Sequence, residues 1–188
     1  RIMSMGAGSG NVPGYPLAKL YVTGHELKSI LEILLVSGKS TASNYCFYSG
    51  LRVEYLPGNG LLKKVQKIQI IKPDGTIRDV NFSKNNEELY SITANSYMLQ
   101  FIGIIKKMSF GLINVVPKDA EGKVVKDIKT AIIDMDDKDA GIQEGREWLA
   151  IMEYIRAMKD RNGNNIPDID PKYKNPVFNF LPVGAARK

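Results

Sequence analysis

The order of three segments constrains the fold more than any other feature of this sequence. Residues 17–22 are predicted to form a strand, residues 23–36 a helix, and residues 45–55 an aromatic-rich second strand. Thr23 and Glu26 have the spacing of a capping box, in which each side chain accepts a hydrogen bond from the backbone N–H of the other residue. The helix is therefore expected to begin directly where the first strand ends.

The middle of the chain predicts a mostly antiparallel sheet. Pro57-Gly58-Asn59-Gly60 and Lys72-Pro73-Asp74-Gly75 are turn sequences, and the first of them predicts a hairpin. The strands predicted around these turns are residues 45–56, 62–71, 76–80 and 89–94. Residues 96–107 are predicted as a helix or as a strand-to-helix transition, and residues 111–116 as a short strand.

The last third of the chain predicts one amphipathic helix and a tail. Residues 143–159 place apolar side chains on one helical face, namely Trp148, Ile151, Met152, Ile155 and Met158. Residues 160–188 show no periodicity and are predicted as a loop and an extended tail that packs through aromatic residues. We therefore expect an α+β fold, a mixed or antiparallel sheet with flanking helices, with one domain over residues 1–159 and the tail over residues 160–188.

Composition limits the classes of protein to consider. A chain of 188 residues with 44% hydrophobic composition can bury the core of one domain. No apolar run reaches the ~20 residues that span a bilayer, and residues 1–10 lack the pattern of a signal peptide. The net charge is +6, but the lysines are spread along the sequence. This distribution favours a solvated basic face, so we expect neither a nucleic-acid partner nor a membrane span.

Three stretches, taken in order, carry a resemblance to a known family. They are Tyr21-Val22-Thr23-Gly24-His25-Glu26-Leu27, the run Tyr45-Cys46-Phe47-Tyr48-Ser49-Gly50-Leu51-Arg52-Val53-Glu54-Tyr55, and Leu89-Tyr90-Ser91-Ile92-Thr93-Ala94-Asn95-Ser96-Tyr97. In this order they resemble the C-terminal domain of the bacterial 5′-nucleotidase/UDP-sugar hydrolase family. The resemblance implies a nucleotide or nucleoside substrate, a periplasmic or extracellular location, and an N-terminal metallophosphoesterase domain in the same precursor. Because the sequence starts partway through the pattern, we expect a fragment of that precursor.

The resemblance also implies which residues bind substrate. It places Tyr45 where the family has an aromatic residue that stacks on the base, with Phe47 on the same face of the strand. Ordinary packing on a sheet is the alternative for both rings. The Gly-Gly-Asp-Gly loop that precedes a second stacking aromatic in better-known members is absent here, so Phe101 or Phe110 could replace that ring. Asn95 completes the predicted substrate-binding set.

The sequence offers no catalytic centre of its own. A two-metal phosphoesterase needs several histidine and carboxylate ligands around its ions, and this chain has one histidine, His25. We expect no catalytic residues and no catalytic cofactor in this chain, which would be a piece of a phosphoric monoester hydrolase whose divalent metals lie in the N-terminal domain.

A second pattern follows the last predicted helix. Oxygen-bearing side chains alternate along residues 160–168, and the predicted calcium ligands are Asp160, Asn162, Asn164, Ile166 and Asp168. An Asn- and Gly-rich turn that binds no metal is the alternative. Two functions follow from the sequence: the substrate-recognition domain of a secreted metal-dependent 5′-nucleotidase or related phosphoesterase, or a non-catalytic extracellular binding module, which Ca²⁺ could stabilise.

Overall fold

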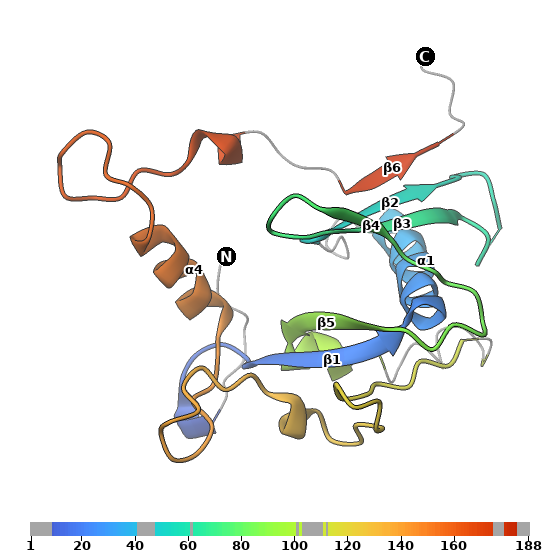
Figure 1. The fold of residues 1–188 in the computed structure, drawn as a ribbon, viewed down its shortest axis with the longest axis horizontal. Coiled ribbons are helices and arrows are strands. Elements are labelled where there is room, and N and C mark those ends of the chain that lie inside the picture. The colour runs from blue at the N-terminus through green and yellow to red at the C-terminus, as the bar shows by residue number, and fades with distance from the viewer. Residues whose placement is uncertain are drawn as a thin grey trace.

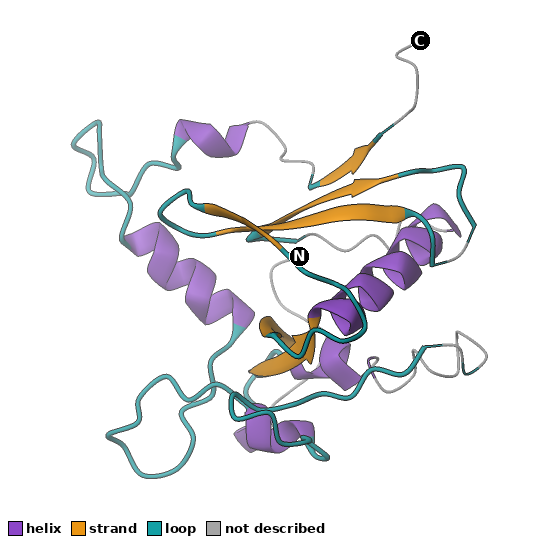
Figure 2. Ribbon diagram, turned by 45° about the vertical axis from the view of Figure 1, so that its right-hand side comes forward, coloured by secondary structure: helices purple, strands orange, loops and turns teal. Residues whose placement is uncertain are grey.

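In the part of the chain that the structure describes, two β-sheets are joined by one long helix (Figure 1). The computed structural model describes residues 9–40, 48–60, 62–100, 102, 111, 113–174 and 179–183. Its elements are η1 (Ser9–Asn11), β1 (Leu17–Thr23), α1 (Gly24–Ser40), β2 (Leu51–Tyr55), β3 (Val65–Ile71), β4 (Ile77–Asp79), β5 (Leu89–Asn95), α2 (Ser96–Gln100), η3 (Ile128–Ala131), α4 (Glu147–Arg156), η4 (Pro171–Lys174) and β6 (Phe180–Pro182). Figure 2 shows α1 beside the larger sheet and α4 on the opposite side of the molecule.

The sheets confirm the predicted α+β class. One sheet pairs β1 with β5 in antiparallel fashion, and the other has the order β4-β3-β2-β6. Within the larger sheet β4-β3 and β3-β2 are antiparallel, whereas β6 runs parallel to β2. The predicted turn at residues 72–75 is present, since Gly75 N donates to Lys72 O at 2.9 Å. Residues 45–47 of the predicted aromatic strand lie outside the described residues, and from Tyr48 onward the strand β2 starts at Leu51, after a bend at Ser49 and Gly50.

The core lies around α1. Leu27, Ile30 and Leu31 are buried on this helix, as its periodicity predicts. They pack with Ala18, Leu20 and Val22, which alternate with more exposed residues along β1. Val53 and Ile68 contribute the part of this core that comes from the larger sheet. One helix therefore supplies apolar surface to both sheets.

The predicted capping box forms at the start of α1. Thr23 N donates to Glu26 Oε2 at 2.8 Å, and Glu26 N donates to Thr23 Oγ1 at 3.3 Å. Glu26 also accepts from Val116 N at 2.9 Å and pairs with Lys118 Nζ at 2.9 Å. Burial alone would raise the pKa of Glu26, but these hydrogen bonds outweigh it and lower the pKa below its ordinary value of 4.5. The carboxylate thus links β1, α1 and the segment at residues 116–118.

We expect Glu26→Gln to make the unfolding free energy change less between pH 7 and pH 3 than it does in the wild type. The folded pKa lies below the unfolded one, so the contribution of Glu26 is complete above ~pH 5 and is lost as the pH falls through the folded pKa. Urea unfolding between pH 7 and pH 3 measures this. The difference in unfolding free energy between the wild type and Glu26→Gln should be largest at pH 7 and shrink toward pH 3. The exposed Glu153→Gln is the control, and a pH-independent difference for Glu26→Gln would contradict the expectation.

The chain from residue 113 to 146 follows β1 without forming a regular strand. Lys118 bridges to Tyr21 and Ile132 to Ala18, and Leu17 N donates to Gly145 O at 2.7 Å. The strand predicted at residues 111–116 was wrong for described residues 113–116, which have no regular structure. Isolated bridges replace it, so β1 still has hydrogen-bonded neighbours on both sides.

The last predicted helix is shorter and more exposed than its sequence indicates. It begins at Glu147 instead of Gln143, because residues 145 and 146 remain extended and bond to the chain at the start of β1. Among the described residues of α4, no side chain is buried, and Ile151 and Met152 are 38% and 40% exposed. The predicted apolar face is covered only in part, since Trp148, Ile155 and Met158 are half-buried whereas Ile151 and Met152 are exposed.

The described part of the tail contains a strand, β6, where the sequence predicted only an extended segment. Val53 N donates to Asn179 O at 2.7 Å and Val183 N to Tyr55 O at 2.8 Å, which adds β6 to the larger sheet. The Phe180 ring packs edge-on against Tyr48 and Tyr55, with ring centroids 5.1 and 6.3 Å apart. Figure 1 shows the chain leaving the body through α4 and returning as β6. Within the described residues, no helix has the length and apolar character that a membrane crossing needs.

Candidate functional site

Two tyrosine rings meet where β1 begins and β5 ends. The antiparallel register pairs Leu17 with Asn95. Tyr15 lies two residues before Leu17, and Tyr97 lies two residues after Asn95, in the first turn of α2. Their rings are stacked, with centroids 5.1 Å apart and planes inclined by 19°. This geometry is the offset parallel arrangement that aromatic pairs favour.

The pair differs in exposure. Tyr15 is half-buried, whereas Tyr97 is 45% exposed. An exposed, oriented ring is a surface on which a planar heterocycle can stack, and stacking of a base on an aromatic ring is worth ~1–3 kcal/mol. Neither tyrosine was predicted from the sequence as a site residue. Only the pairing of β1 with β5 brings them together, and no local sequence pattern indicates that pairing.

Asn95, predicted to bind substrate, lies beside this pair and is 9% exposed. Its Oδ1 accepts from Met98 N at 2.8 Å, and its Nδ2 donates to Glu147 Oε1 at 2.8 Å. The side chain therefore fixes the first turn of α2 and connects it to the first residue of α4.

Arg146 supports the other side of the pair and is 5% exposed. Its Nη1 donates to Val12 O at 2.9 Å and also to Gly14 O, while its Nη2 pairs with Glu144. Gly14 has a φ of 88°, a left-handed conformation that favours glycine, directly before Tyr15. The guanidinium thus binds backbone carbonyls of the turn that directly precedes Tyr15.

Trp148 also bonds to the segment before Tyr15. Its Nε1 donates to Pro13 O at 3.0 Å, and the ring is half-buried. Together with Arg146, it attaches the start of α4 to residues 12–14.

The other predicted substrate-binding residues, Tyr45, Phe47, Phe101 and Phe110, lie outside the described residues, and their roles stay predictions.

The loop predicted to bind calcium is shaped by its own hydrogen bonds. Asp160 accepts from the backbone N–H groups of Asn162, Gly163 and Asn165. Partial desolvation would raise the pKa of Asp160, but these hydrogen bonds lower it below its ordinary value. Asp168 accepts from Arg161 N at 2.8 Å and from Asn162 Nδ2 at 3.1 Å. The calcium ligands stay a prediction.

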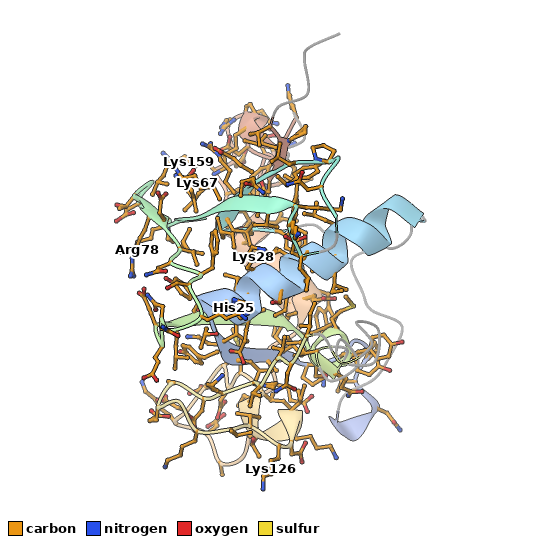
Figure 3. The ribbon with its side chains drawn as sticks, turned by 90° about the vertical axis from the view of Figure 1, so that its right-hand side faces the viewer. His25, Lys28, Lys67, Arg78, Lys126 and Lys159 are labelled. Carbon is orange, nitrogen blue, oxygen red and sulfur yellow. The ribbon has the colours of Figure 1, made fainter. Side chains whose placement is uncertain are left out.

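The described part of the chain holds no group of three histidine, cysteine, aspartate or glutamate side chains placed to bind one metal ion. His25 lies in the first turn of α1, on the side of the molecule that Figure 3 presents. The basic side chains labelled there, such as Lys67 and Arg78, are spread over several elements. These two form ion pairs with Asp79 and Glu88.

Comparison with known families matches residues 12–104 to the family described as 5′-nucleotidase, C-terminal domain. Residues 12–104 belong to this family. Both stacked tyrosines and Asn95 lie inside the nucleotidase segment, whereas Arg146, Glu147 and Trp148 lie outside it.

Two solved structures are similar to this chain at low identity. One is the 5′-nucleotidase precursor from Thermus thermophilus, with 18% identity over 59% of this chain and a TM-score of 0.41. The other is the NAD nucleotidase of Haemophilus influenzae, with 15% identity over 52% of this chain and a TM-score of 0.40. The matched parts cover only 20% and 17% of those chains. No curated protein matches the sequence.

Proposed function

We propose that this chain is the nucleoside-recognition part of a secreted or periplasmic, metal-dependent 5′-nucleotidase, and that Tyr97, backed by Tyr15, stacks on the base. The observation that carries the proposal is an exposed, oriented tyrosine stack inside the segment that belongs to the 5′-nucleotidase C-terminal domain family. Hydrolysis would take place on a separate metallophosphoesterase domain of the same precursor. The chain would hold the nucleoside and leave the phosphate to that domain.

The surroundings of the pair suit a ligand with one apolar face and polar edges. Tyr97 offers a ring face, and its hydroxyl is a donor and acceptor. Glu147 and Trp148, at the start of α4, are half-buried and bond to Asn95 and Pro13, which lie near the tyrosine pair in the sequence. A base can gain stacking energy on the ring, while its edge remains available to polar groups.

We expect the chain to bind adenosine and uridine but not ribose, as measured by isothermal titration calorimetry. Tyr97→Ala should weaken nucleoside binding by about five- to a hundredfold, because it removes ~1–3 kcal/mol of stacking. Tyr97→Phe should change the affinity little, since the ring face remains. Tyr154→Ala removes an exposed tyrosine on α4 and is the matched control.

Tyr45→Ala tests the ring predicted from the sequence in the same assay. A comparable loss would make Tyr45 a further wall of the same pocket. Unchanged binding by a folded Tyr97→Ala would remove the tyrosine pair from the proposal. If the unmutated chain bound neither nucleoside, the proposal would fail in favour of a binding module that recognises something else.

A further inference from the structure

We infer that Arg146 and Glu147, at the start of α4, are positioning residues that hold the Tyr15–Tyr97 stack in place. They lie outside the segment that matches the family, yet their side chains reach the chain next to each ring. The effect on ligand binding rests on the proposed function. The effect on the rings themselves rests on geometry alone.

On the Tyr15 side, Arg146 fixes the turn that precedes the ring. Its Nη1 donates to the carbonyl oxygens of Val12 and Gly14, and the latter residue is the direct neighbour of Tyr15. Glu144 holds the other end of the guanidinium. A guanidinium is suited to this role because it is planar and presents several N–H donors in a fixed geometry.

On the Tyr97 side, Glu147 acts through Asn95. The carboxylate accepts from Asn95 Nδ2 at 2.8 Å, which orients the amide so that its oxygen accepts from Met98 N. Tyr97 lies between Asn95 and Met98 in the chain. The hydrogen bond from Met98 N to Asn95 therefore fixes the backbone that carries the Tyr97 ring. Without Glu147, the amide of Asn95 would lose the partner that orients it.

The backbone explains how two adjacent residues serve both rings. Arg146 has an extended conformation, with φ −134° and ψ 148°, and bridges to Pro16, the residue after Tyr15. Arg146 is the extended residue before α4, and Glu147 is the first residue of the helix. The Arg146 side chain reaches residues 12–14, while the Glu147 side chain reaches Asn95 at the end of β5.

The test compares Glu147→Ala with Glu147→Gln. Glutamine keeps an Oε1 acceptor for Asn95 Nδ2, and alanine removes it. Glu153→Ala, an exposed position on the same helix, is the control. The readouts are the ring signals of Tyr97 in the NMR spectrum of tyrosine-labelled protein, assigned through Tyr97→Phe, and the affinity for adenosine.

In Glu147→Ala, the Tyr97 ring signals should move toward those of unstacked tyrosine, and adenosine binding should weaken by about fivefold. Glu147→Gln should restore the signals and bring the affinity to within about twofold of the wild type. If Glu147→Ala did not fold, Arg146→Lys would replace it, with the Tyr15 signals expected to move because lysine lacks the planar fork.

The outcomes separate this inference from the proposed function. Shifted ring signals in a chain whose wild type binds no nucleoside would support the positioning role and overturn the proposed function. Unchanged ring signals in folded Glu147→Ala would overturn the positioning role, whatever the affinity for adenosine. Signals that move equally in Glu147→Ala and Glu147→Gln would also overturn it, because the hydrogen bond would then not be their cause.

Discussion

Gly24→Ala should strongly destabilise the protein. A Cβ on Gly24 would lie 2.2 Å from Asn81 O, 3.0 Å from Asn81 C and 3.1 Å from Val80 Cγ1. Two of these three contacts are with backbone atoms, which cannot rotate away as the end of a side chain can. Val80 is further held because its N–H donates to Ile68 O at 2.9 Å.

The size of the effect follows from what must move. Overfilling a packed site usually costs ~1–3 kcal/mol and occasionally more, and a backbone clash belongs at the upper end of that range. For a chain of this length each kcal/mol lowers the melting temperature by roughly 2–4 °C, so we expect a loss of about 6–12 °C. Helix propensity alone would favour alanine over glycine by up to ~1 kcal/mol, so the sign of the change shows which effect dominates.

Gly58→Ala is the matched control. A Cβ at Gly58 would meet no atom within 4 Å. Its melting temperature should therefore stay within about 2 °C of the wild type. Thermal unfolding followed by circular dichroism measures both variants. A Gly24→Ala protein as stable as Gly58→Ala would show that residues 80 and 81 do not approach α1 this closely.

The elements predicted best from the sequence are those held by short-range interactions. The Thr23–Glu26 capping box and the turn at residues 72–75 each form within four residues, so the sequence contains both partners side by side. The predicted boundary between β1 and α1 was confirmed for the same reason.

The candidate site depends on pairings that sequence spacing does not reveal. Tyr15 and Tyr97 become neighbours only through the pairing of β1 with β5. Arg146 contacts Val12 although the two residues are 134 positions apart in the sequence. The partner of Glu26 in the 116–118 segment was likewise not predicted. Long-range hydrogen bonds decide these positions, and local patterns hold no information about them.

The exposed face of α4 shows a different limit. The periodicity correctly predicted that apolar side chains such as Ile151 and Met152 lie along one helix. Periodicity identifies which side chains share a face but not what lies opposite that face. None of the α4 side chains is fully buried, although the helix is amphipathic as predicted.

Glu32→Ala should be the second strongly destabilising change, because it removes a fully buried carboxylate with three donors. Glu32 is 0% exposed and accepts from Val65 N at 2.8 Å, from Lys64 N at 3.2 Å and from Lys28 Nζ at 3.0 Å. It therefore ties the first residue of β3 to the middle of α1. Alanine would leave the Val65 amide buried without this partner and the Lys28 ammonium without its counter-charge.

Removing one partner of a buried ion pair costs ~3–5 kcal/mol, so we expect Glu32→Ala to lower the melting temperature by about 6–20 °C. Glu32→Gln keeps one carbonyl acceptor and should cost less than Glu32→Ala. Glu153→Ala breaks an exposed pair with Arg156 and should change the unfolding free energy by less than about 1 kcal/mol. Urea unfolding at pH 7 ranks the three variants. The two positions differ because Glu32 is buried and accepts three hydrogen bonds, whereas Glu153 is exposed. Equal stabilities of Glu32→Ala and Glu153→Ala would therefore mean that the Glu32 carboxylate does not hold β3 against α1.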